Sequence, residues 1–101
     1  MTEDHLPGKL DARLPPILVL GRDTCEDTIR SRDYLAQEGI AYIYRNVELD
    51  PDADAWNRSF NGGDRVTPVI LVGDPKAPSA ILIEPSDDDL GAAIAAKMQE
   101  E

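Results

Sequence analysis

The chain has 101 residues, 42 % of them hydrophobic, which is enough to build the core of one domain. Its 20 acidic and 10 basic residues give a net charge of -10, which argues against nucleic acid or an anionic membrane as a partner. One cysteine, Cys25, excludes an internal disulfide, and with one distant histidine, His5, it supports neither a zinc site nor a cysteine–histidine pair. No apolar run reaches the roughly 18 residues of a membrane span, and the acidic N-terminus does not resemble a signal peptide. We therefore expect a cytoplasmic protein.

The first strand is expected directly after a polar N-terminal segment. Residues 1–15 contain a Pro7-Gly8 break, so we expect them to be flexible and the domain to span residues 16–101. Residues 17–20 form an unbroken apolar run that Gly21 ends. Such a run predicts a strand that is buried on both faces, as in a sheet with parallel pairing.

A helix is expected to follow over residues 25–38, with Gly39 ending it in the left-handed conformation. Thr24 is its expected N-cap, and Asp27 is the expected partner in a capping box. Cys25 would then be the first helical residue, where unpaired N–H groups and the helix dipole favour a thiolate. A single cysteine is often a small buried apolar residue instead. Its place between a strand and a helix favours the reactive interpretation.

A second strand and a second helix are expected next. Residues 40–47 are rich in aromatic and β-branched side chains, which predicts a strand. Asp50 and Pro51 then fit the N-cap and first residue of a helix that ends at residues 61–63. Helical spacing predicts the core-facing side chains of the two helices, which are Ile29, Leu35, Ala36, Trp56 and Phe60.

The last three elements complete the expected order β-α-β-α-β-β-α. The apolar runs 69–72 and 80–83 are joined by a short link, which predicts an antiparallel hairpin. Ser86, with Asp89 three residues later, begins the final helix. We expect an α/β fold with a four-stranded mixed sheet and the first strand in a central position. Cys25 would then lie beyond the carboxyl end of that strand, where open α/β sheets bind ligands.

Three motifs give the chain a resemblance to the glutaredoxins, small thioredoxin-fold proteins, over residues 16–98. Arg22-Asp23-Thr24-Cys25-Glu26-Asp27-Thr28 is similar to their Lys/Arg-x-x-Cys-x-x-Cys/Ser/Thr. Val66-Thr67-Pro68 is similar to their Thr-Val-Pro, whose proline is cis and faces the thiol. Glu84-Pro85-Ser86-Asp87-Asp88 lies where they carry Gly-Gly-x-Asp-Asp, and it looks closer to the Asn/Glu-Pro-Ser of mycoredoxin-like members.

The resemblance implies a site that is organised around Cys25 as the nucleophile. Thr67 and cis-Pro68 would present backbone to a docked thiol, and the start of the last helix would hold an amino or carboxylate group of that thiol. The implied co-substrate is a low-molecular-weight thiol of the glutathione or mycothiol type, with no bound cofactor. The expected thiol-binding residues are Arg22, Thr28, Thr67, Pro68, Ser86, Asp87 and Asp88.

Two departures from the family pattern affect the expected chemistry. Thr28 stands where a dithiol site has its second cysteine, so only a monothiol route with an outside thiol as reductant is open. Glu26 and Asp27 place two carboxylates beside the sulfur. We expect them to keep the thiol pKa near the ~8.5 of free cysteine. They should also disfavour acidic thiols such as glutathione.

We therefore expect a glutaredoxin-type, monothiol thiol–disulfide oxidoreductase that acts on disulfide-containing proteins in cell redox homeostasis, as a monomer. One alternative is a catalytically weak thioredoxin-fold module that binds a small thiol or a protein partner. Another is an iron–sulfur carrier, although the chain lacks the Cys-Gly-Phe-Ser site of the family's carriers. The acidic cluster from Ser86 to Asp89 also fits a simple helix cap.

Overall fold

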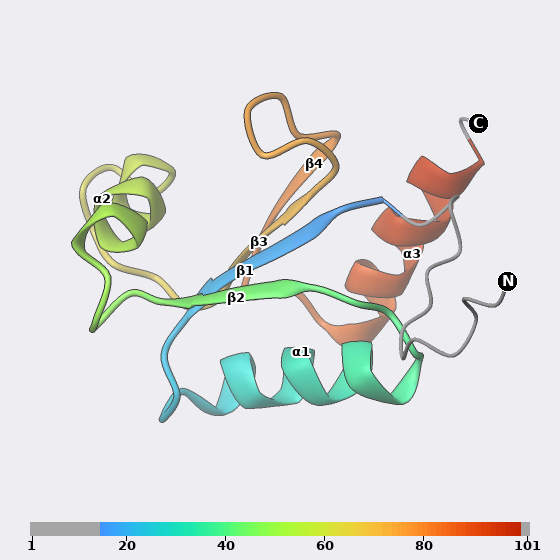
Figure 1. Ribbon diagram of the computed structural model, residues 1–101, viewed down its shortest axis with the longest axis horizontal. Coiled ribbons are helices and arrows are strands. Elements are labelled where there is room, and N and C mark those ends of the chain that lie inside the picture. The colour runs from blue at the N-terminus through green and yellow to red at the C-terminus, as the bar shows by residue number, and fades with distance from the viewer. Residues whose placement is uncertain (1–14, 100–101) are drawn as a thin grey trace, which may run out of the picture.

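A computed structural model describes residues 15–99, so the expected flexible segment 1–15 lies outside the described residues except for Pro15. Three helices and four strands follow one another in the expected order (Figure 1). They are β1 (Ile17–Gly21), α1 (Glu26–Gln37), β2 (Ile43–Asn46), α2 (Pro51–Ser59), β3 (Val69–Val72), β4 (Ala80–Ile83) and α3 (Asp87–Met98). The second strand is shorter than expected, because only four of the residues in 40–47 pair with β1.

The strands form one mixed sheet in the order β2-β1-β3-β4. β1 pairs with β2 in parallel and with β3 antiparallel, and β3 forms the predicted antiparallel hairpin with β4. All residues of β1 and β3 are buried, which confirms that the uninterrupted apolar runs predict inner strands.

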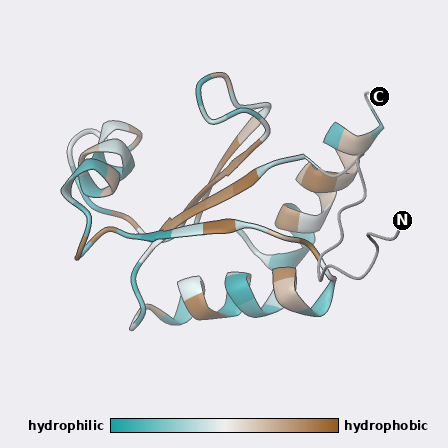
Figure 2. Ribbon diagram, viewed as in Figure 1, coloured by the Kyte–Doolittle hydropathy of each residue, from teal (hydrophilic) through white to brown (hydrophobic). Residues whose placement is uncertain are grey.

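The two faces of the sheet are covered unequally. In Figure 1, α1 and α3 lie on one side of the sheet and α2 lies on the other. The first face packs Val19 and Ile70 against Leu35 and Ile94 of the two helices. The second face packs Leu18, Leu20, Val69 and Leu71 against Ala53, Trp56 and Phe60, so both aromatic side chains of α2 contact the core as expected. Figure 2 shows that hydrophobic residues are concentrated in the strands, whereas α1 and α2 alternate between hydrophobic and hydrophilic residues.

α1 buries a different face from the expected one. Leu35 is buried as predicted, but Ile29 is 44 % exposed and Ala36 is also exposed. The other buried residues of the helix are the hydroxyl residues Thr28 and Ser31, which share a face with Leu35. A search for apolar spacing passes over these hydroxyl side chains, and this is why the predicted face was wrong.

Gly21 and Thr28 explain why a threonine packs against the sheet at this point. A Cβ atom on Gly21 would lie 2.6 Å from Cγ2 and 2.7 Å from Oγ1 of Thr28. The absence of a side chain at the end of β1 therefore lets the first turn of α1 approach the strand closely. This close approach positions the segment between them, which carries Cys25.

Candidate active site

Cys25 is the N-cap residue of α1, with an extended backbone conformation, and the helix begins at Glu26. The backbone N–H of Cys25 donates a hydrogen bond to the carbonyl of Arg22 at 3.2 Å, which closes the turn after β1. This turn delays the start of the helix by one residue. The predicted N-cap at Thr24 and its capping box with Asp27 were therefore wrong, and the Asp27 carboxylate accepts a 2.7 Å hydrogen bond from Arg30 instead.

The sulfur of Cys25 is partly exposed and faces the loop before β3. Its thiol donates to the backbone carbonyl of Thr67 at an Sγ–O distance of 3.5 Å. The peptide between Thr67 and Pro68 is cis, as the resemblance implied. The side chains of both loop residues are buried, so the loop presents mainly its backbone to the sulfur.

Local hydrogen bonds lower the pKa of the Cys25 thiol below its ordinary value. Partial burial raises this pKa, but hydrogen bonds with the hydroxyl groups of Thr67 and Thr28 lower it by more in total, together with those from the backbone N–H groups of Thr28 and Asp27. The N-terminus of α1 thus stabilises the thiolate although the adjacent side chains are acidic.

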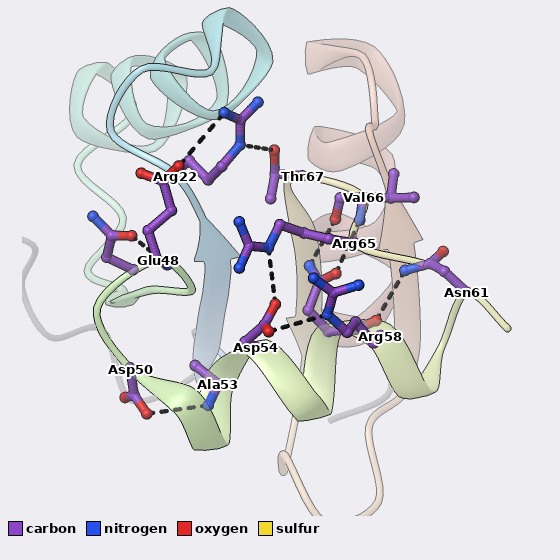
Figure 3. Close-up of polar contacts among 12 residues, drawn as sticks. Arg22, Glu48, Asp50, Ala53, Asp54, Arg58, Asn61, Arg65, Val66 and Thr67 are labelled. Atoms are coloured by element: carbon purple, nitrogen blue, oxygen red, sulfur yellow. Dashed lines mark hydrogen bonds and ion pairs between the residues drawn. The ribbon is translucent and has the colours of Figure 1, made fainter. Parts of the chain in front are cut away.

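An open groove of about 290 Å³ surrounds the sulfur. It is lined by Arg22, Cys25, Arg65, Val66, Thr67 and Glu84. Arg22 lies across it, because its Nε donates to Thr67 Oγ1 at 3.4 Å and its Nη1 is 3.8 Å from Oε2 of Glu48 (Figure 3). The groove therefore combines the thiol of Cys25 with a guanidinium group that two contacts hold in place.

A second open groove, of about 530 Å³, continues from the first towards the start of α3. Its lining comprises Asp27, Arg30, Glu84, Ser86, Asp87 and Asp88, and Glu84 is common to both grooves. Arg30 is fully engaged, because it donates to Asp27 and to the Pro85 carbonyl at 3.0 Å and lies 3.7 Å from Asp87. Four carboxylates and one paired guanidinium therefore make this groove acidic.

Ser86 is the N-cap of α3, as predicted, and its hydroxyl accepts from the Asp89 N–H at 3.1 Å. Glu84, two residues earlier, has a φ of 51°, a left-handed conformation that non-glycine residues seldom adopt. Its backbone N–H donates to the carbonyl of Pro68 at 2.9 Å. This bond joins the loop that faces the sulfur to the loop that begins α3, so both grooves share a common wall.

α2 holds the loop that carries Thr67. The side chain of Asn57 is fully buried and exchanges hydrogen bonds with the backbone of Val66 at 2.6 and 3.0 Å. Asp54 accepts from Arg58 at 3.0 Å and from Arg65 at 2.9 Å, as Figure 3 shows. These contacts fix the two residues that precede Thr67.

The structure brings most of the sequence-predicted site residues together. Arg22 and Thr67 share a groove with Cys25, and Ser86, Asp87 and Asp88 line the adjoining one. Thr28 differs, since it is fully buried and its hydroxyl accepts from the Arg22 N–H at 3.4 Å. It therefore has no exposed surface for a ligand.

Five residues that line the grooves were absent from the predicted set, namely Asp27, Arg30, Arg65, Val66 and Glu84. Within residues 15–99, no group of three or more histidine, cysteine, aspartate or glutamate side chains is arranged to hold a metal ion. Over the same range no helix has the length and apolar character needed to cross a membrane.

Neither a scan against protein-family models nor a search of curated proteins finds a match to this sequence. Among solved structures, it is similar to the solution structure of glutaredoxin from Brucella melitensis, with a TM-score of 0.57 over 87 % of each chain. The chain has a glutaredoxin fold. The two sequences are 19 % identical, so the likeness concerns the arrangement of the backbone. It confirms the predicted α/β class, the four-stranded mixed sheet and the thioredoxin-like topology.

Proposed function

We propose that this protein is a glutaredoxin-type thiol–disulfide oxidoreductase that reduces mixed disulfides through Cys25 by a monothiol route. The observation that carries the proposal is the partly exposed sulfur at the N-terminus of α1, 3.5 Å from the Thr67 carbonyl and open to a groove. A lowered thiol pKa supports it, because the thiolate is the attacking species.

The proposed reaction has two exchange steps. In the first, the Cys25 thiolate attacks the small-thiol sulfur of a protein mixed disulfide, forms a new S–S bond, and releases the protein thiolate, which takes a proton from water. In the second, a free small thiolate attacks that small-thiol sulfur, which releases the Cys25 thiolate and forms the small-molecule disulfide. The chain has no second cysteine to carry out the second step internally. In each cycle one free small thiol is therefore oxidised to the disulfide level, and the protein client regains one thiol.

The two grooves offer places for the co-substrate, a low-molecular-weight thiol of the glutathione or mycothiol type. An ammonium group suits the carboxylates of Glu84, Asp87 and Asp88. A carboxylate group suits the N-terminal N–H groups of α3. Because carboxylates outnumber guanidinium groups in the second groove, we propose that acidic thiols such as glutathione bind less well than neutral or cationic ones.

The monothiol mechanism also determines the cellular compartment that we propose for the protein. A site with one thiol needs a compartment rich in reducing thiol, which the cytoplasm provides. The protein would act there as a monomer in redox homeostasis, with disulfide-containing proteins as clients and without a bound cofactor. The net charge of -10 argues against nucleic acid and membrane surfaces as partners.

The test is turnover of a synthetic mixed disulfide, run in parallel with glutathione, mycothiol and bacillithiol as reductants. Cys25→Ser should abolish turnover. A matched control moves the thiol by one residue, as Cys25→Ser together with Thr24→Cys, and should also be inactive because the sulfur no longer faces Thr67. Absence of turnover with all three thiols, or turnover that persists in Cys25→Ser, would contradict the proposal.

A binding module that uses the same grooves is the second candidate. It is favoured by the carboxylates of Asp27, Glu84 and Asp88 in the adjoining groove, which repel an acidic thiol such as glutathione. In that case, a small thiol would change the chemical shifts of the Thr67 and Asp88 amides while no disulfide is turned over.

A further inference from the structure

The residue before the cis-proline is a threonine, which contacts both an arginine and the sulfur: its hydroxyl accepts from Arg22, and its carbonyl accepts from the Cys25 thiol. We infer that the Thr67 hydroxyl is a hydrogen-bond donor to the Cys25 thiolate and that Arg22 is the positioning residue that orients it. This inference rests on the proposed function only in taking Cys25 as the nucleophile.

The hydrogen bonds around Thr67 determine which way its hydroxyl proton points. Nε of Arg22 donates to Thr67 Oγ1 at 3.4 Å, so one lone pair of the hydroxyl is occupied and its single hydrogen must point elsewhere. Thr67 is 6 % exposed, which leaves little room for water to accept that hydrogen. The Cys25 sulfur lines the same groove as Thr67 and lies 3.5 Å from the carbonyl oxygen of that residue.

Ionisation of the sulfur changes which group of Thr67 it can use. The neutral thiol donates its proton to the Thr67 carbonyl. Once that proton has left to water, the carbonyl oxygen faces an anion and no longer accepts a bond from it. The hydroxyl of the same residue can then donate to the sulfur. A hydrogen bond between the Thr67 side chain and Cys25 is also among the causes that lower the thiol pKa.

The guanidinium groups that line the groove are paired with carboxylates, so neither is an uncompensated positive charge beside the sulfur. Arg22 is paired with Glu48 at 3.8 Å and Arg65 is paired with Asp54 at 2.9 Å. The carboxylate of Glu84 lines the same groove, and Glu26 lies in the first turn of α1. Asp27, also on α1, is paired with Arg30 at 2.7 Å.

Arg22 is held in place from both sides for this positioning role. Its backbone N–H donates to Thr28 Oγ1 at 3.4 Å, and its carbonyl accepts from the Cys25 N–H at 3.2 Å. Its guanidinium lies between Glu48 and Thr67 (Figure 3). The chain of contacts from Glu48 through Arg22 to Thr67 therefore ends at the nucleophile.

The experiment titrates the thiolate by its ultraviolet absorbance in the protein without any added thiol. Thr67→Val removes the hydroxyl, keeps the shape, and should raise the Cys25 pKa by about one unit or more. Thr67→Ser keeps the hydroxyl and should restore most of the wild-type value. An unchanged pKa in Thr67→Val, or an equal rise in Thr67→Ser, would overturn the inference.

Arg22→Lys tests the positioning role, because lysine keeps the charge but lacks the Nε–H that Thr67 accepts. It should raise the pKa in the wild-type background and change it much less in the Thr67→Val background. Equal effects in both backgrounds would contradict the positioning role. If Thr67→Val does not fold, an unchanged pKa in Arg22→Lys alone rejects the inference. Because the titration needs no turnover, its failure is distinguishable from failure of the proposed function.

Discussion

Asn57 and Val66 exchange two hydrogen bonds, in which the buried side-chain amide of the first occupies both backbone polar groups of the second. Asn57→Leu would fill a similar volume but leave the N–H and C=O of Val66 without partners. We expect it to lower the free energy of unfolding by about 2–4 kcal/mol, measured by urea denaturation.

Asn61→Ala is the matched control for this substitution. The Asn61 amide donates to the Asn57 carbonyl at 2.9 Å near the end of α2 and has no contact with Val66. Its loss should cost about 1 kcal/mol and leave the reactivity of Cys25 unchanged. Comparable losses of stability in the two variants would show that the contact with Val66 has no special importance.

The contact between Gly21 and Thr28 predicts a steric effect that a second substitution reverses. Gly21→Ala would place a Cβ atom 2.6 Å from Cγ2 of the fully buried Thr28. We expect this overpacking to destabilise the protein by about 1–3 kcal/mol in urea denaturation. Adding Thr28→Ala removes both clashing atoms and should recover much of that loss. Two losses that simply add would contradict the steric explanation.

Thr28 lies three residues after Cys25, in the first turn of α1, which predicts that a second thiol at this position reaches the first. Thr28→Cys should therefore resolve a small-thiol adduct on Cys25 by internal attack, which forms an intramolecular disulfide and releases the small thiol. Intact-mass measurement should show loss of the adduct mass.

Ser31→Cys is the matched control, since Ser31 is also buried on the same face of α1 but one turn further from Cys25. The small-thiol adduct on Cys25 should persist in the Ser31→Cys variant. An adduct that survives equally in Thr28→Cys would show that the side chain at position 28 cannot reach the sulfur.

The lowered thiol pKa predicts how reactivity and stability depend on pH. Alkylation of Cys25 should speed up as pH rises through the lowered pKa and then level off. Between the folded and unfolded pKa values the unfolded chain binds more protons, so stability should rise with pH there. The contribution is lost as pH falls through the folded pKa. The difference in free energy of unfolding between wild type and Cys25→Ser, measured by urea denaturation at several pH values, isolates the contribution of the thiol. If this stability advantage of the wild type declined as pH rises, the predicted direction would be wrong.

The acidic second groove predicts a preference for the charge of the substrate. Mixed disulfides of equal size that carry an ammonium group should react faster than those that carry a carboxylate, and added salt should reduce the difference. Glu84→Gln should narrow the preference, because Glu84 lines both grooves. Glu38→Gln, at the exposed C-cap of α1 and outside both grooves, controls for the change in net charge. A preference that is insensitive to both salt and Glu84→Gln would reject this explanation.

Local sequence signals were sufficient to predict most of the fold. Apolar runs over residues 17–20 and 69–72 identified the inner strands, because a strand covered on both faces has no polar positions. Asp50 and Ser86 identified two helix starts through their side-chain oxygens, which cap those helices in the structure. The start of α1 was misplaced because the turn closed by Arg22 and Cys25 is a backbone feature with no distinctive side chain.

The site was less predictable because its two sides come from distant parts of the chain. Cys25 and Thr67 could be placed opposite each other only through the resemblance to glutaredoxins. Arg65 reaches the groove because Asn57 fixes the adjacent backbone, and Glu84 reaches it because its backbone is left-handed. Neither condition can be recognised from a residue type in the sequence.

β1 is hydrogen bonded on both sides, and all its residues are buried. Amide protons in such a strand exchange with deuterated solvent only when the whole domain opens. β3 is also an inner strand with all its residues buried, and Thr67 lies two residues before it, while the turn that carries Cys25 follows β1. Both sides of the site are therefore attached to the best protected strands of the sheet, so the separation of Cys25 and Thr67 should stay nearly constant until the whole domain opens.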